Sequence, residues 1–125
     1  MIVLDASAVL AAMLAEPGAD RVYAVIDESV ICSVNAAEVI TRLVEKGYGE
    51  TAVRSYYEGL DLAVFDFDEH LAVIAGLLRG PTRERGLSLG DRACLALAIR
   101  EKATALTADR NWRGLDVYCP IELIR

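Results

Sequence analysis

Four acidic residues of this sequence stand close to points where one predicted secondary-structure element ends and the next begins: Asp5, Glu38, Asp91 and Asp109. Gathered at one edge of a fold, their carboxylates would repel one another and raise each other's pKa values, and a bound divalent cation would remove that cost. Carboxylate oxygens from several elements, with waters completing the shell, suit Mg²⁺ or Mn²⁺, whereas zinc prefers His and Cys. The four acids are therefore candidate ligands of such an ion, provided that the fold brings them together.

Residues 87–112 predict a helix followed by a short strand, with an acid at each open end. A helix rises about 1.5 Å per residue and a strand about 3.3 Å, so a dozen or so helical residues are offset by four or five extended ones. Asp91 at the start of the helix and Asp109 at the end of the strand should then lie at the same edge of the domain. Asp5, which follows the first predicted strand, and Glu38, in the first turn of a later helix, should reach that edge as well.

The remaining elements alternate between strand and helix, as apolar runs, amphipathic spacing and turn residues indicate. The predicted strands cover residues 1–4, 29–33 and 62–65, with an edge strand at 116–119 that Pro120 ends. The predicted helices cover residues 6–15, 19–28, 35–46, 50–59 and 69–78, and residues 80–86 form a basic loop. Such alternation is typical of an α/β fold with a mostly parallel sheet covered on both faces, whose crevice lies beyond the carboxyl ends of the strands.

The bulk composition fits one domain that spans residues 1–125. A hydrophobic share of 54% with only 6% aromatic residues is typical of a layered α/β protein. The longest apolar runs, such as residues 71–78, fall well short of the roughly 18 to 20 residues that cross a bilayer, so no membrane segment is expected. The start lacks the basic lead of a signal peptide and the cysteines show no metal-binding spacing, so the sequence predicts a cytoplasmic location.

The charge balance bears on the partner, because 19 acidic and 13 basic residues give a net charge of -6. This balance argues against a protein that binds nucleic acid only by neutralising phosphates with Lys and Arg. A metal ion in the acidic cluster would supply positive charge and polarise a phosphate oxygen, which is the chemistry of phosphodiester hydrolysis. Three arginines near the acids are candidates for contacts with the substrate backbone, although a solvated loop and helix face explains them equally well: Arg85, Arg92 and Arg110.

Helix capping is the competing explanation for each acid taken singly. The pairs Ser88 and Asp91, and Asn35 and Glu38, have the spacing of a capping box, and the other two acids stand where simple N-caps stand. Acids at helix starts are common because they complement the amide donors there. Only the expectation that all four share one edge favours a metal site over four unrelated caps.

The segments that carry these acids, LDASAVLA, NAAEVITRL, LSLGDRACLALA and ALTADRNW, occur in an order that resembles the PIN domain family, above all the VapC-type toxins of toxin-antitoxin pairs. No single segment is specific, but the ordered set covers nearly the whole chain. The resemblance implies a compact three-layer α/β/α fold and endoribonuclease activity that depends on Mg²⁺ or Mn²⁺. It also implies a homodimer and a small VapB-like antitoxin that blocks the site.

Residue by residue, the resemblance also implies roles. The acidic quartet of the family falls on the four acids above, of which the aspartates would hold the metal while Glu38 would ligate or orient the attacking water. Supporting polar positions fall on Ser7, Thr107 and Asn111. At Asn111 some relatives carry one more acid, so the resemblance does not fix whether one metal is bound or two.

Other functions remain open beside this one. A PIN domain nuclease could process RNA without a toxin role, and a non-catalytic signalling or interaction module could keep the acids only to bind Mg²⁺. A receiver domain would need an acid pair near the first strand and a Lys after the fifth, neither of which this chain has. A phosphatase with an aspartyl nucleophile would need an acid at position 7, which is Ser7 here.

The partner prediction also has candidate residues. Apolar and aromatic side chains could line a groove for an antitoxin segment or for a second copy of the chain. Packing in the core is the commoner explanation for such residues. The candidates are Val9, Met13, Tyr23, Tyr48, Tyr56 and Tyr57.

Overall fold

A computed structural model describes the whole chain, residues 1–125, and a parallel β-sheet lies at its centre. The five strands are hydrogen-bonded in the order β3-β2-β1-β4-β5, and all neighbours run parallel. They are β1 (Ile2–Leu4), β2 (Ser29–Cys32), β3 (Ala63–Phe65), β4 (Thr104–Thr107) and β5 (Ile121–Leu123). The predicted α/β fold with a central parallel sheet is therefore confirmed.

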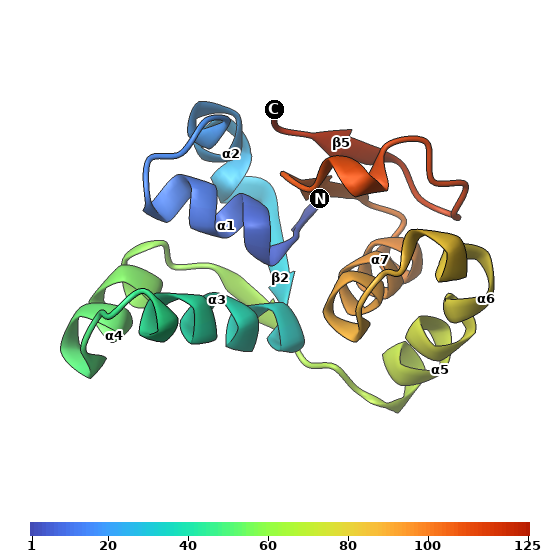
Figure 1. Cartoon of the computed structure of the whole chain (residues 1–125), viewed down its shortest axis with the longest axis horizontal. Helices are drawn as coiled ribbons and strands as arrows, with labels where there is room; N and C mark the ends of the chain where they lie inside the picture. The colour runs from blue at the N-terminus through green and yellow to red at the C-terminus, as the bar shows by residue number, and fades with distance from the viewer.

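Helices flank the sheet on both sides and complete three layers, with α1 to α4 on one side of the strands and α5 to α7 on the other (Figure 1). The first group comprises α1 (Ala6–Met13), α2 (Ala19–Val25), α3 (Ser33–Glu45) and α4 (Glu50–Gly59). The second group comprises α5 (Glu69–Leu77), α6 (Arg79–Thr82) and α7 (Leu89–Glu101). Short 3-10 turns follow α2, α6 and β4 at Ile26–Glu28, Arg83–Arg85 and Arg110–Trp112.

Alternation of side chains along the strands divides the apolar core between the two faces of the sheet. Val3 and Cys32 belong to the core shared with α5 and α7, whereas Leu4 and Ile31 belong to the core shared with α1 to α4. Each face is therefore apolar, as expected of a parallel sheet buried on both sides. A shift of one residue in any strand would move its core side chains to the wrong face, so these two cores fix the register.

The strand order reverses direction between β1 and β4. From β1 the chain adds β2 and β3 on one side, and it then returns past β1 to place β4 and β5 on the other. Ligands of open α/β sheets bind at such a switch point, in the crevice beyond the carboxyl ends of the strands. Asp5 directly follows β1, and Thr107 ends β4. The topology of the sheet thus places both residues at this crevice.

Two predicted segments differ in the structure. The expected loop at 80–86 contains part of α6 and a 3-10 turn, since Pro81 is tolerated in a first helical turn and buried Thr82 donates to the Leu78 carbonyl at 2.7 Å. The expected edge strand at 116–119 is wrong, because Pro120 precedes β5 instead of ending a strand. Its carbonyl accepts a hydrogen bond from the Ala105 N–H at 2.9 Å, a role for which a proline needs no N–H of its own.

The starts of two helices matter for the acids. Helix α3 begins at Ser33, two residues earlier than expected, so Asn35 and Glu38 lie inside it and the predicted Asn35 cap is wrong. Helix α7 begins at Leu89 after the N-cap Ser88, which places Asp91 in its first turn, as the capping pattern predicts. No helix combines the length and the apolar character needed to cross a bilayer.

Candidate active site

A cavity of about 400 Å³ lies at the carboxyl edge of the sheet. All four acids contribute to its wall, so the prediction that they share one edge is confirmed. They reach it from the end of β1, from α3, from α7 and from the segment after β4. The complete wall is formed by Asp5, Ala6, Ser7, Leu10, Leu14, Glu16, Glu38, Arg42, Lys46, Asp91, Asp109 and Arg125.

Asp5 is the most deeply placed of the four acids, with 4% of its surface exposed. Its carboxylate does not cap α1 but accepts hydrogen bonds from the hydroxyls of Ser7 at 2.6 Å and Thr107 at 2.9 Å. Burial is the main cause that raises the pKa of Asp5, the two hydroxyls oppose it, and the nearby Asp91 carboxylate raises it further. The carboxylate is therefore held in place by donors but has no cation beside it.

The two hydroxyls also hold the chain that leads to Asp109. Ser7 Oγ accepts from the Ala108 N–H at 2.9 Å, and Thr107 Oγ1 accepts from the Asp109 N–H at 3.0 Å. Each hydroxyl has a single proton and donates it to Asp5. The two hydroxyl oxygens lie 3.1 Å apart, but neither has a second proton to donate to the other. These bonds connect the first and fourth acids through neutral groups that are buried or nearly so.

Glu38 lies against α7 beside Gly90. A Cβ on Gly90 would overlap the Glu38 carboxylate, so the missing side chain leaves the space that this carboxylate occupies. The amide of buried Asn35 donates to the Gly90 carbonyl at 3.0 Å and lies 3.4 Å from Glu38 Oε1. Burial, followed by the charges of Asp5 and Asp91, raises the pKa of Glu38 from 4.5 to about 7, whereas Arg42 opposes the rise.

Asp91 and Asp109 each cap a helix or turn and also line the cavity. Asp91 Oδ2 accepts from the Ser88 N–H at 2.9 Å and Ser88 Oγ accepts from the Asp91 N–H at 3.1 Å, which completes a capping box. Asp109 Oδ1 accepts from the Asn111 N–H at 2.9 Å and so caps the turn after β4. Capping thus explains these two acids in part, but it does not explain Asp5 or Glu38.

The donor set of the cavity fits a hard divalent cation. None of the four acids takes part in an ion pair, although two other residues of the wall, Glu16 and Arg125, pair with each other. All four offer carboxylate oxygens, which Mg²⁺ and Mn²⁺ prefer. They surround the cavity without converging on one point, because no three acidic, His or Cys side chains are close enough to share an ion as they stand. Ion binding would require the side chains to close inward.

Most of the other predicted site residues lie outside the cavity wall. Arg85 donates to the backbone carbonyl of Asn111 at 2.7 Å, and the Asn111 amide donates to the Arg85 carbonyl at 2.7 Å. Arg92 donates to the Ala75 carbonyl at 2.9 Å and so joins α7 to α5. Arg110 is exposed and is absent from the wall. The structure therefore brings Ser7 and Thr107 to the acids but directs Arg85, Arg92 and Asn111 to structural bonds.

Sequence reasoning missed three basic residues of the wall, Arg42, Lys46 and Arg125. Arg42 and Lys46 follow Glu38 at intervals of four, a spacing that places residues on one helix face and was visible in the sequence. Nothing local pointed to Arg125, which reaches the cavity only because β5 lies beside β4. The role of Gly90 could not be predicted either, because the carboxylate that lies beside it belongs to α3, more than forty residues away in the chain.

Comparisons with known proteins agree with this architecture. The sequence model of the PIN domain family matches residues 2–118, a range that contains all four acids. No curated protein sequence gives a significant match. Among solved structures, the chain resembles VapBC2 from Rickettsia felis bound to a promoter DNA fragment, with a TM-score of 0.74 and 21% identity over 98% of both chains.

Two further solved structures show the same likeness. One is the DNA-bound VapBC of Salmonella typhimurium, with a TM-score of 0.77, 19% identity and coverage of 99% of this chain and 98% of that chain. The other is FitAcB from Neisseria gonorrhoeae, with a TM-score of 0.66, 21% identity and coverage of 97% and 96%. At such identities the likeness establishes the fold.

Proposed function

Because the chain belongs to the PIN domain family, whose members are generally nucleases, we propose that it is a metal-dependent endoribonuclease that hydrolyses RNA phosphodiester bonds. The observation that carries the proposal is the cavity itself, whose wall contains four acids from four segments, none of them in an ion pair. A purely structural cluster would leave their mutual repulsion uncompensated. A divalent cation bound between these acids and a phosphate group would compensate the negative charge of both.

The residues present suggest how the work is divided. Asp5, Asp91 and Asp109 would hold Mg²⁺ or Mn²⁺, which supplies a Lewis acid at the scissile phosphate and makes a water easier to deprotonate. Ser7 and Thr107 orient the Asp5 carboxylate through their hydroxyls, a supporting role that commonly tunes a ligand. Glu38, with a pKa raised to about 7, would orient the attacking water and accept its proton near neutral pH.

The biological role we propose is that of the toxin in a type II toxin-antitoxin pair, acting in the cytoplasm. The solved structures that resemble the chain include VapBC complexes from several bacteria, which supports a VapC-like toxin and a VapB-like antitoxin as partner. An RNA-processing nuclease without an antitoxin is the second candidate. After induction of the chain in cells, new RNA 5′ ends are mapped and growth is followed. Both candidates should produce new ends, but the toxin should also arrest growth.

A groove between α3 and α4 supplies a docking surface for the proposed antitoxin. The cavity there measures about 630 Å³ and is lined by Ile40, Val44, Tyr48, Glu50, Val53, Arg54, Tyr57 and Glu58. Two of the candidates from the sequence, Tyr48 and Tyr57, lie in it. Val9 is instead buried in the core, and Tyr23 donates its hydroxyl to the Ala12 carbonyl. An apolar helix of a partner would fit such a groove.

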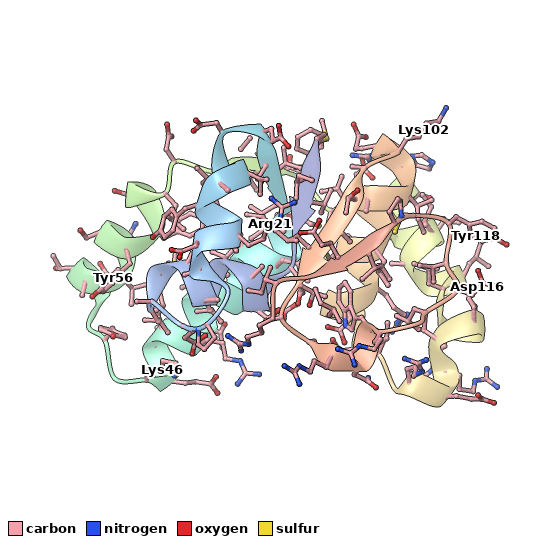
Figure 2. The ribbon with its side chains drawn as sticks, turned by 90° about the horizontal axis from the view of Figure 1, so that it is seen from above. Arg21, Lys46, Tyr56, Lys102, Asp116 and Tyr118 are labelled. Atoms are coloured by element: carbon pink, nitrogen blue, oxygen red, sulfur yellow. The ribbon has the colours of Figure 1, made fainter.

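The nuclease proposal is tested by incubating the purified chain with RNA and Mg²⁺ or Mn²⁺. Cleavage should stop on addition of EDTA and should be lost in Asp5→Asn and Asp91→Asn. The matched control is Asp116→Asn, because Asp116 is exposed and lies at the far end of the molecule from Lys46, which lines the cavity (Figure 2). Full metal-dependent cleavage by either cavity variant would refute the assignment of these acids.

The homodimer is a separate proposal with its own test. Size-exclusion chromatography with light scattering should give twice the mass of 13.6 kDa at micromolar concentration. A single monomeric peak at every concentration would contradict it without bearing on the chemistry of the cavity.

A further inference from the structure

The cavity is not uniformly acidic. Beside five carboxylates, those of the four acids and of Glu16, its wall contains the cationic side chains Arg42, Lys46 and Arg125. The three apolar residues of the wall, Ala6, Leu10 and Leu14, come from α1 and its C-cap. The wall therefore offers an acidic, a basic and an apolar surface within one space.

Helix α3 sets the order of these surfaces. Glu38, Arg42 and Lys46 follow one another at intervals of four residues, so they share a face and extend over about 12 Å at roughly 1.5 Å per residue. Glu38 is at the end near Asp5 and Asp91, whose charges raise its pKa, and Lys46 is the C-cap at the opposite end. Helix α1 packs against α3, which brings the apolar residues beside this row. The cavity thus changes from acidic to basic along α3.

The cations of this row are available for a ligand. Lys46 takes part in no ion pair and no side-chain hydrogen bond. Arg42 forms its one ion pair with Glu45 at 4.0 Å, an exposed pair of the kind that contributes little, and it also lowers the pKa of Glu38 through its charge. Arg125 differs, because it donates to the Pro17 carbonyl at 2.9 Å and lies 3.9 Å from Glu16. Arg42 and Lys46 therefore form the free part of the basic surface.

We propose that Arg42 and Lys46 form a subsite for the phosphates of a single-stranded RNA next to the scissile bond, while Leu10 and Leu14 contact an unpaired base. This inference rests on the nuclease function proposed above and assigns the side of the cavity along which the substrate runs. Lys and Arg neutralise backbone phosphates, and an unpaired nucleotide can present its phosphate and its base to two surfaces at once. A duplex would keep its bases away from the α1 surface.

The test compares charge reversals with a matched control. Arg42→Glu and Lys46→Glu are made singly and together, and Lys102→Glu is the control because Lys102 is an exposed C-cap of α7, as Lys46 is of α3. The two lysines lie at opposite edges of the molecule (Figure 2). Thermal unfolding of all variants checks that the fold is intact.

Binding of a labelled single-stranded RNA is measured by anisotropy over a range of salt concentrations, and cleavage is measured with Mg²⁺. The double variant should bind at least about tenfold more weakly, with a slope of log K against log salt reduced by roughly 1.4, about 0.7 for each lost phosphate contact. Its KM should rise more than its kcat falls, and Lys102→Glu should match the wild type. An unchanged slope and KM, or equal binding of a duplex of the same sequence, would overturn the inference.

The two proposals fail in different ways. If the wild-type chain does not cleave RNA with any divalent metal, the nuclease function is wrong. If it cleaves RNA and the double variant cleaves with unchanged KM, the function stands and the subsite along α3 is wrong.

Discussion

At the level of single residues, the two hydroxyls around Asp5 distinguish this acid from an ordinary helix cap. Ser7 and Thr107 both donate to its carboxylate, and both accept from the backbone that leads to Asp109. Such buried groups are costly to leave unpaired. The two hydroxyls therefore stabilise the fold and orient a proposed metal ligand at the same time.

Replacing Thr107 tests this double role. Thr107→Val keeps the shape but removes one donor to Asp5 and the acceptor of the Asp109 N–H, so the free energy of unfolding should fall by about 1 to 3 kcal/mol. Urea unfolding can be followed through the fluorescence of buried Trp112. Thr41→Val is the control, since exposed Thr41 donates only within its own helix and should change stability by less than about 0.5 kcal/mol. Equal effects of the two variants would contradict the network.

At the level of elements, the contact between α3 and α7 decides where Glu38 lies. Asn35 and Glu38 on α3 both meet Gly90, the residue directly before Asp91 on α7. The separation of the second and third acids thus depends on how closely these helices approach. Glycine at this point permits the approach because it has no side chain to fill the space.

Gly90→Ala should separate activity from stability. The new Cβ would displace the Glu38 carboxylate, and misplacing a catalytic group by about 1 Å can cost on the order of 100-fold in rate. Stability should change little or rise, because alanine is favoured over glycine in a helix by up to about 1 kcal/mol. Gly76→Ala is the control, since Gly76 in α5 has open space around it and should gain stability without loss of cleavage. Normal cleavage by Gly90→Ala would show that the position of Glu38 does not matter.

At the level of the whole molecule, the acidic cavity should make stability depend on pH and on metal. Glu38 has a pKa near 7 in the folded state and an ordinary value of 4.5, and the pKa of Asp5 is raised as well. The folded protein therefore holds protons that the unfolded chain has released, so stability falls as pH rises between these values. A divalent cation that binds only the folded state would offset this loss.

Unfolding by urea from pH 4.5 to pH 8, with and without Mg²⁺, tests that dependence. Without Mg²⁺ the free energy of unfolding should decline as the pH rises toward 7, and Glu38→Gln should flatten the decline. At pH 8, Mg²⁺ at a hundredfold excess over its Kd should add about 2.7 kcal/mol to the wild type. Asp5→Asn should lose most of this gain. A wild type that is indifferent to Mg²⁺ and Mn²⁺ at pH 8 would argue against a metal in the cavity.

The sequence by itself determined the elements and the edge at which the acids gather. The alternation of apolar runs and amphipathic segments is local, and strand and helix rises are fixed by the backbone, so Asp91 and Asp109 were expected at one edge and lie there. The start of α7 after the N-cap Ser88 could also be predicted, because the capping pattern is local. The prediction of an edge strand at 116–119 was wrong because a proline can stand at the end or at the start of a strand. The sequence around Pro120 does not show which neighbouring strand it would pair with.

Only the tertiary structure decided which side chains share the cavity with the acids. Arg85 and Arg92 bond to backbone carbonyls, whereas Arg42 and Arg125 reach the cavity wall. Gly90 matters because of a carboxylate on another helix. Such contacts join residues far apart in the chain, and the packing of helices on both faces of a sheet sets them. Periodicity determines which face of an element is polar, but it does not determine what that face meets.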